Sequence, residues 1–158
     1  RVISYLFGGK VHISSSILRM GTSGARMDNY SVGGIACRIG LDGRLAKQAI
    51  DRNWTWIDKH PRGAVFEKIQ VPSYDRIIEC VQRTHLELPF FRVIGWDFAV
   101  DKLGEPVLIE YNGAPDLNQI SCGPMFGDLT ESILDYIFLS KPELVLHLSD
   151  GHGFAEVV

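Results

Sequence analysis

The first twenty residues read as extended chain folded back on itself. Two candidate strands, at residues 1–6 and 10–18, flank Gly8-Gly9, a pair suited to the positive φ angles of a tight hairpin turn. A polar loop follows, and the small and β-branched residues of 29–40 predict another strand, which Gly33-Gly34 interrupts. The pattern therefore begins with a hairpin and continues as β-structure.

The middle of the chain combines a turn, an irregular segment and a helix. Residues 41–45 have the composition of a second hairpin turn, and residues 51–65 show neither helical nor strand periodicity, which predicts an ordered loop. Ser73 follows a proline and is suited to be an N-cap. Apolar residues then recur at helical spacing to about residue 85, so we expect a helix there.

The last third of the chain predicts a third hairpin and a second helix. Residues 91–100 and 106–112 read as strands around a turn at 101–104, and the prolines and glycines of 113–124 indicate a loop. Apolar residues of 129–138 mark one face of a helix. Hairpins outnumber helices and strands do not alternate with helices, so the fold class is α+β, a mainly antiparallel sheet covered by two helices.

Composition narrows the class of protein. The 158 residues are 46% hydrophobic and 22% charged, as in one soluble globular domain, and a formal charge of −3 provides no global field for binding nucleic acid. The apolar stretches are shorter than the ~20 residues that span a bilayer. We therefore expect no nucleic-acid partner, no membrane span and a cytoplasmic protein. Cys37, Cys80 and Cys122 lack metal-binding spacing, which predicts buried free thiols.

The third hairpin carries the most informative chemistry. If Lys102 pairs with Glu105 across a two-residue turn, Asp97 lies directly opposite Glu110. Asn112 shares the face of Glu110 because side chains of a strand repeat every two residues. Opposed carboxylates repel, so such a pair usually has a compensating cation. Asp, Glu and Asn are hard oxygen ligands, and they favour Mg²⁺ or Mn²⁺ bound together with substrate phosphates.

A solvated hairpin end with incidental acids is the alternative interpretation of this pattern. A shift of one residue in register would send Asp97 to the other face of the sheet. The apolar run 107–109, which is typical of a buried strand, leads directly into an acid and an amide. This run favours a functional site over an incidental cluster.

A second candidate site lies upstream. Arg19 offers a fork of donors to a phosphate or carboxylate, and Gly33-Gly34 allows backbone to approach a ligand closely. A surface arginine and a strand bulge would explain the same residues without a ligand.

The motifs also match a known order. R-x-G at Arg19, D-N-x-x-x-G-G at Asp28, G-x-D at Asp97 and E-x-N-x-x-P at Glu110 resemble the carboxyl-terminal half of ATP-grasp enzymes, in the branch of glutathione synthetase and glutamate-adding ligases. The longer segments L-R-M-G, D-N-Y-S-V-G-G-I, V-I-G-W-D-F-A-V and E-Y-N-G-A-P-D are similar to the sugar-transfer associated ATP-grasp family. This resemblance covers about residues 1–138.

The resemblance implies roles for individual residues. Asp97, Glu110 and Asn112 would bind two magnesium ions on the phosphates of ATP. Arg19 would be catalytic and lie beside the γ-phosphate. The phosphate and the acceptor carboxylate would also lie beside three residues of the second motif, Asn29, Gly33 and Gly34.

One position departs from the family pattern. The glutathione synthetase branch has an arginine two residues before the asparagine, and this chain has Met27 there. Arg26 is one place off, so we expect it to contact the substrate in a shifted register or the acceptor to be recognised differently.

A larger departure concerns the extent of the chain. In ATP-grasp enzymes the adenine-binding strands and a phosphate-contacting lysine precede the matching region, and this chain begins without a leader pattern. We expect residues 1–140 to be the C-terminal part of an ATP-grasp domain, which holds the metal and acceptor side. Residues 141–158 are weakly patterned and predict a peripheral tail.

The expected activity is an ATP- and Mg²⁺-dependent ligase (Mn²⁺ being the alternative metal) that phosphorylates a carboxylate and lets an amine displace the phosphate. Its partners would be a small carboxylate and an amine or saccharide-linked acceptor. Two alternatives stay open: a two-metal phosphoesterase, and a non-catalytic binding module that uses Trp54 and Trp56 as a platform. Tryptophans in such a loop more often form satellite core.

Overall fold

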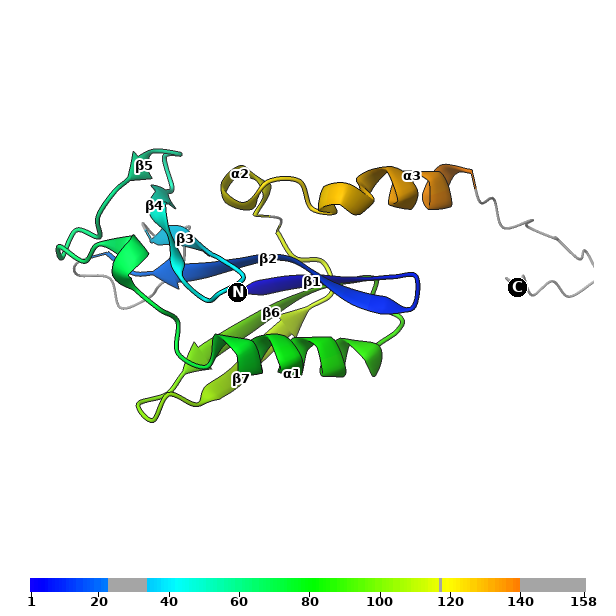
Figure 1. Ribbon diagram of the computed structural model, residues 1–158, viewed down its shortest axis with the longest axis horizontal. Coiled ribbons are helices and arrows are strands. Elements are labelled where there is room, and N and C mark those ends of the chain that lie inside the picture. The colour runs from blue at the N-terminus through cyan, green and yellow to red at the C-terminus, as the bar shows by residue number, and fades with distance from the viewer. Residues whose placement is uncertain (23–33, 117, 140–158) are drawn as a thin grey trace, which may run out of the picture. The chain divides into compact units, whose positions relative to one another are not determined.

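The computed structural model describes residues 1–22, 34–116 and 118–139. Within them, seven strands form one antiparallel sheet in the order β5-β4-β3-β2-β1-β6-β7 (Figure 1). β1 (Val2–Phe7) and β2 (Lys10–Met20) form the predicted first hairpin, and Gly8 and Gly9 at the turn have φ angles of 57° and 72°. β1 therefore lies in the interior of the sheet, between β2 and β6.

The second hairpin is also present. It joins β3 (Ile35–Ile39) to β4 (Leu45–Asp51), and Gly43 has a positive φ at its turn. The predicted loop 51–65 contains a two-residue strand, β5 (Trp56–Ile57), which pairs with β4. Residues 29–33 of the predicted third strand lie outside the described residues.

Helix α1 (Tyr74–Leu86) confirms the predicted first helix and packs on one face of the sheet (Figure 1). Its buried residues recur at helical spacing and form a single stripe: Tyr74, Ile77, Val81 and His85. Ser73 occupies the N-cap position, as expected, but its side chain does not cap the helix. Ser73 has a left-handed backbone with φ of 51° and makes no cap bond; its hydroxyl donates instead to the carbonyl of Gly104 at 2.7 Å.

The third hairpin joins β6 (Val93–Val100) to β7 (Pro106–Asn112). The expected two-residue turn is wrong, because the backbone N–H of Asp101 bonds to the carbonyl of Glu105 and the register beside the turn pairs Val100 with Pro106. The expectation that 107–109 is buried is also wrong. β7 is the edge strand of the described sheet, and all three side chains are exposed.

The core occupies both faces of the sheet. On the α1 face, Trp96 and Ile94 pack against the helix, and a second cluster forms around Phe66, in the short helix η2 (Phe66–Lys68). The opposite face carries Ile17, Ala36 and Ile50, with Cys122 against them. Cys122 lies in α2 (Gln119–Cys122), a short helix within the segment expected to be a loop.

A buried polar network joins the helix to the sheet. The indole Nε1–H of Trp96 donates to Ser4 Oγ at 2.7 Å. Nε2 of His85 faces a carbonyl and carries the proton of the neutral ring, so Nδ1 accepts the hydroxyl of Ser4, also at 2.7 Å. His85 Nε2–H then donates to the carbonyl of Phe91 at 2.8 Å. Ser4 and His85 are fully buried, and the described residues contain no buried side-chain nitrogen or oxygen that lacks a partner.

The thiols differ in their surroundings. Cys37 is fully buried, and burial raises the pKa of its thiol to about 11. Cys80 and Cys122 are half-buried, so the expectation of buried free thiols is met at Cys37 only.

The chain separates into two compact units, residues 1–125 and 126–158. The described part of the second unit contains η3 (Gly127–Leu129) and α3 (Thr130–Phe138), which is the predicted second helix. The α+β class is confirmed, with a mainly antiparallel sheet. Among the described helices, none has both the length and the apolar character that crossing a membrane requires.

Candidate active site

Asp97 and Glu110 lie directly opposite each other on β6 and β7, as the sequence predicts. Beside the turn the register differs by one residue from the expected one. A bulge at Ile109 restores it, since Phe98 pairs with Leu108 whereas Asp97 pairs with Glu110. The bulge therefore places the two carboxylates on one face of the sheet, opposite the face that Trp96 shares with α1.

Asn112 occupies the next position on the same face. It pairs with Gly95, two residues before Asp97, and its side-chain Oδ1 accepts the backbone N–H of Ala114 at 2.9 Å. Asn112 and Glu110 are exposed, whereas Asp97 has only 6% of its surface accessible. The three predicted metal ligands therefore share a face but differ in their access to solvent.

Gly95 lets the following loop approach the strand. A Cβ on Gly95 would lie 2.6 Å from the Cβ of Pro115, which is closer than two carbon atoms can pack. The close contact fixes Pro115 over the sheet, and with it the chain that follows Asn112. The glycine of the G-x-D motif thus has a packing role beside the predicted ligands.

Two arginines neutralise Asp97. Arg1 donates from Nε to Oδ1 at 2.9 Å and from Nη2 to Oδ2 at 2.7 Å, and Arg19 Nη2 lies 3.1 Å from Oδ2. Burial of the carboxyl opposes its ionisation, but the hydrogen bonds and charge of Arg1 and the charge of Arg19 outweigh this, so the pKa of Asp97 lies below its usual value. Asp97 is therefore an anion held by two cations.

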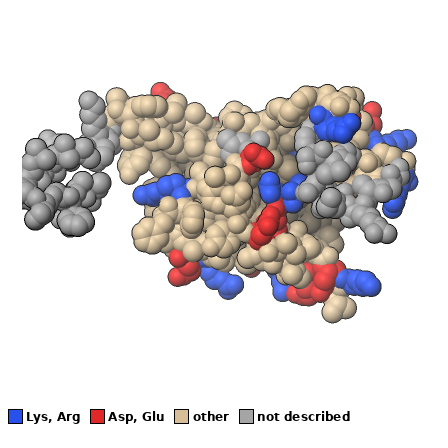
Figure 2. Space-filling view, turned by 180° about the vertical axis from the view of Figure 1, so that it is seen from behind, with Lys and Arg blue, Asp and Glu red and all other residues tan. Residues whose placement is uncertain are grey.

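Further carboxylates act on Arg1 electrostatically. The hydrogen bonds that Arg1 donates to Asp97 and the negative charges of Asp97, Asp116 and Glu110 together raise the pKa of Arg1. On the face of the molecule seen in Figure 2, basic and acidic side chains meet near the centre. The candidate site itself is a mixed charge cluster, because Arg1 and Arg19 contact Asp97 and Glu110 lies opposite Asp97.

Sequence reasoning assigned no role to Arg1 or His60. Arg1 lies 96 residues from Asp97, and no spacing rule connects the two; the available signal is a charged residue at the start of an apolar strand. Nδ1 of His60 accepts the N–H of Arg62, so its Nε2–H donates to the carbonyl of Gly21 at 3.1 Å. His60 therefore holds the glycine of the R-x-G motif.

The remaining predicted residues are only partly described. Gly34 is buried immediately before β3. Arg26, Asn29 and Gly33 lie outside the described residues, so their predicted contacts with substrate stay predictions.

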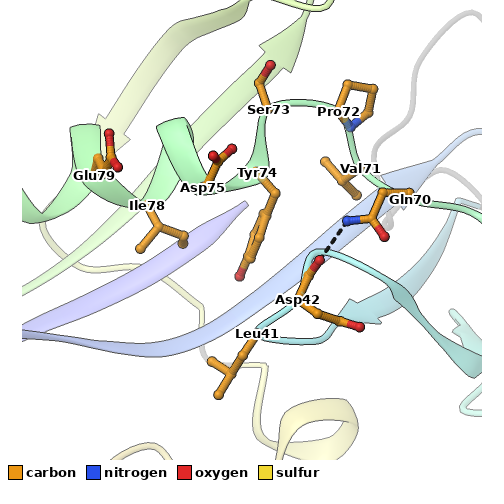
Figure 3. Close-up of a pocket in the computed structure, with 10 residues that line it drawn as sticks. All are labelled: Leu41, Asp42, Gln70, Val71, Pro72, Ser73, Tyr74, Asp75, Ile78 and Glu79. Carbon is orange, nitrogen blue, oxygen red and sulfur yellow. Dashed lines mark hydrogen bonds between the residues drawn. The ribbon is translucent and has the colours of Figure 1, made fainter.

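A pocket of the described residues lies elsewhere (Figure 3). It is a groove of about 590 Å³ lined by residues of the β3–β4 turn and of the start of α1, and the ring of Tyr74 extends from the helix toward that turn. None of the predicted site residues lines this groove. The candidate site is therefore defined by its charged side chains and strand register.

A protein-family model for sugar-transfer associated ATP-grasp proteins matches residues 1–132. The chain belongs to this family. Neither the curated proteins nor the solved structures that were compared with the chain gave a match. The family match covers both arginines, Asp97, Glu110 and Asn112, and it supports an ATP-grasp-type function at the level of the family.

ATP-grasp proteins generally use ATP and Mg²⁺, so the donor set can be tested for its fit to a hard cation. Over the described ranges, no three His, Cys, Asp or Glu side chains are grouped as a metal site. Two carboxylates and one amide oxygen on facing strands do fit the chemistry of Mg²⁺. In the present arrangement, however, both oxygens of Asp97 are engaged by arginine.

Proposed function

We propose that the protein is an ATP- and Mg²⁺-dependent ligase that joins a carboxylate to an amine through an acyl phosphate. This chain would supply the metal and acceptor side of the site. The observation that carries the proposal is the strand register that sets Asp97 opposite Glu110 with Asn112 on the same face. The family match supports the use of ATP.

The chemistry has two steps. An oxygen of the substrate carboxylate attacks the γ-phosphorus of ATP, the bond to the β–γ bridging oxygen breaks, and ADP leaves. The amine nitrogen then attacks the acyl carbon, inorganic phosphate leaves with the carboxylate oxygen, and the amine proton passes to solvent. The protein needs no side-chain nucleophile, in keeping with its chief task of positioning and charge stabilisation in phosphoryl transfer.

The residues of the site have distinct tasks in this scheme. Asp97, Glu110 and Asn112 would hold Mg²⁺, which when bound neutralises charge on the phosphates. Arg19 lies 3.1 Å from Asp97, so its guanidinium is next to the predicted ligands and can stabilise negative charge on the transferring phosphoryl group.

The test is an isotope experiment on the whole protein. Carboxylates labelled with ¹⁸O are screened with Mg²⁺, ATP and a panel of amines, and ADP and phosphate are analysed. A ligase releases ADP only with a carboxylate and transfers one ¹⁸O into inorganic phosphate. Phosphate whose new oxygen comes from water would identify a phosphohydrolase, and no ADP release with any acceptor would favour a binding module.

Glu110→Gln gives a sharper test of the metal side. The variant keeps the size of the side chain but removes its charge, so turnover should fall by a factor on the order of a hundred or more. Arg76→Gln is a matched control, because Arg76 forms an exposed ion pair with Glu105 in the hairpin-turn region of the same sheet. Normal turnover of Glu110→Gln at limiting Mg²⁺ would contradict the metal assignment.

One observation favours the binding-module alternative. Trp54 and Trp56 are 58% and 46% exposed, so the expectation that they form satellite core is wrong. Exposed aromatic rings are suited to stack on saccharides. A fluorescence titration of the protein and of Trp54→Ala with oligosaccharides tests this alternative. It would be excluded if oligosaccharide left the tryptophan emission of the wild type unchanged, or if both proteins bound oligosaccharide with the same affinity.

A further inference from the structure

The contact between Arg1 and Asp97 has the geometry of a strong ion pair. Two parallel N–H groups of one guanidinium bond to the two carboxylate oxygens, at 2.9 and 2.7 Å. Such paired bonds add geometric specificity to the attraction of charge. Only 16% of the Arg1 side chain and 8% of the Asp97 side chain are exposed, so solvent screens the pair little.

This contact is incompatible with metal binding by Asp97 in the same arrangement. A divalent cation needs a carboxylate oxygen directed at it, and it would repel the two guanidinium groups that now bond to both oxygens. Yet the buried carboxylate needs a cation at all times, because an unpaired buried charge is costly. One cation must therefore replace another.

We propose that Arg1 is a stand-in cation, which neutralises Asp97 in the empty site and passes to the nucleotide phosphates when the metal binds Asp97. This inference rests on the proposed function, since it takes Mg²⁺ with a nucleotide as the ligand. The exchange keeps every charge paired: the metal replaces the guanidinium at Asp97, and phosphate replaces the carboxylate at Arg1.

Arg1 is better suited to this exchange than Arg19. It takes both oxygens of Asp97, whereas Arg19 contacts one oxygen at a longer distance. Asp116, which is not among the proposed metal ligands, also acts on Arg1 electrostatically, so the guanidinium stays near a negative charge after it leaves Asp97.

The experiment measures Mn²⁺ binding by electron paramagnetic resonance and calorimetry, first without nucleotide and then with ATP. Arg1→Gln removes the competing charge, so Mn²⁺ alone should bind on the order of tenfold more tightly than to the wild type. ATP increases the affinity for Mn²⁺, and this increase should be smaller in Arg1→Gln than in the wild type. The variant has no guanidinium at position 1 that could pass from Asp97 to the phosphates. Arg76→Gln, which removes an ion pair of the same length outside the site, should leave both affinities unchanged.

The possible results separate this inference from the proposed function. If the whole protein binds Mn²⁺ with ATP but Arg1→Gln binds Mn²⁺ alone no more tightly, Arg1 is a permanent structural partner and the exchange is refuted while the ligase proposal stands. If neither protein binds Mn²⁺ with or without ATP, both proposals are wrong. Should Arg1→Gln fail to fold, Arg1→Lys keeps the charge without the two-bond geometry and should show a smaller gain of the same sign.

Discussion

Asn112 holds its place through one hydrogen bond to its own loop. Its Oδ1 accepts the N–H of Ala114, so an oxygen at this position fixes the chain after β7 as well as offering a ligand. We expect Asn112→Asp to keep both properties and Asn112→Ala to lose both. Loss of one such bond costs about 1 kcal/mol.

The comparison of these two variants is the first prediction. Urea unfolding should show Asn112→Ala destabilised by about 1 kcal/mol, with Asn112→Asp closer to the wild type. ADP release by the whole protein should fall further in Asn112→Ala than in Asn112→Asp. Equal turnover in both variants would show that the oxygen is not a ligand.

The second prediction concerns Asp97 and pH. Because its pKa in the folded protein lies below the unfolded value, its ion pairs stabilise the fold fully above about pH 4 and lose this effect as pH falls through the folded pKa. Asp97→Asn should therefore cost on the order of 3 kcal/mol at pH 7. The difference from the wild type in unfolding free energy should narrow toward pH 2. A difference independent of pH would mean that packing, and not charge, stabilises Asp97.

The residues of the site differed in how far the sequence could predict them. Glu110 and Asp97 belong to one hairpin, so strand periodicity and a single turn relate them. Arg1 precedes β1 and Asp97 lies in β6, and these strands are distant along the chain but neighbours in the sheet. Only the order of strands in the sheet reveals the contact between the two residues. Local pattern carries no information of this kind.

At the scale of the elements, the close contact between β6 and the loop after β7 yields the third prediction. Gly95→Ala would push against Pro115, and overpacking of this kind costs about 1–3 kcal/mol. The double variant Gly95→Ala/Pro115→Gly removes the obstacle. A double-mutant cycle by thermal unfolding should thus show that alanine costs less in the Pro115→Gly background. Additive costs would place the strain elsewhere.

The bounds of strands and helices were predictable where apolar side chains alternate or recur at helical spacing. They were less predictable where a single hydrogen bond determines how an element begins or ends. The stripe of α1 is regular, whereas the hydroxyl of Ser73 bonds to the distant Gly104 and not to its own helix. β7 is apolar but lies at the edge of the described sheet, because strand order and not composition sets its exposure. The bulge at Ile109 likewise has no sequence signal, although the position of Glu110 depends on it.

At the scale of the whole molecule, the network around Ser4 joins β1, β6 and α1 and gives the fourth prediction. Ser4→Ala would leave the N–H of Trp96 and Nδ1 of His85 without partners in a fully buried place. We expect a loss of about 2 kcal/mol in urea unfolding. Ser73→Ala is the control, since it removes one hydroxyl bond at a half-buried position and should cost less than half as much. Equal costs would contradict the network's role.

The interior position of β1 also determines the order in which strands can pair while the chain is being synthesised. β2 can pair with β1 as soon as the first hairpin is synthesised, but β6 begins only at residue 93. Until then one edge of β1 exposes backbone donors and acceptors, which is a template for pairing with another chain. The strand that covers this edge also carries Asp97, so a growing chain acquires its charge cluster in the same step that pairs the open edge of β1.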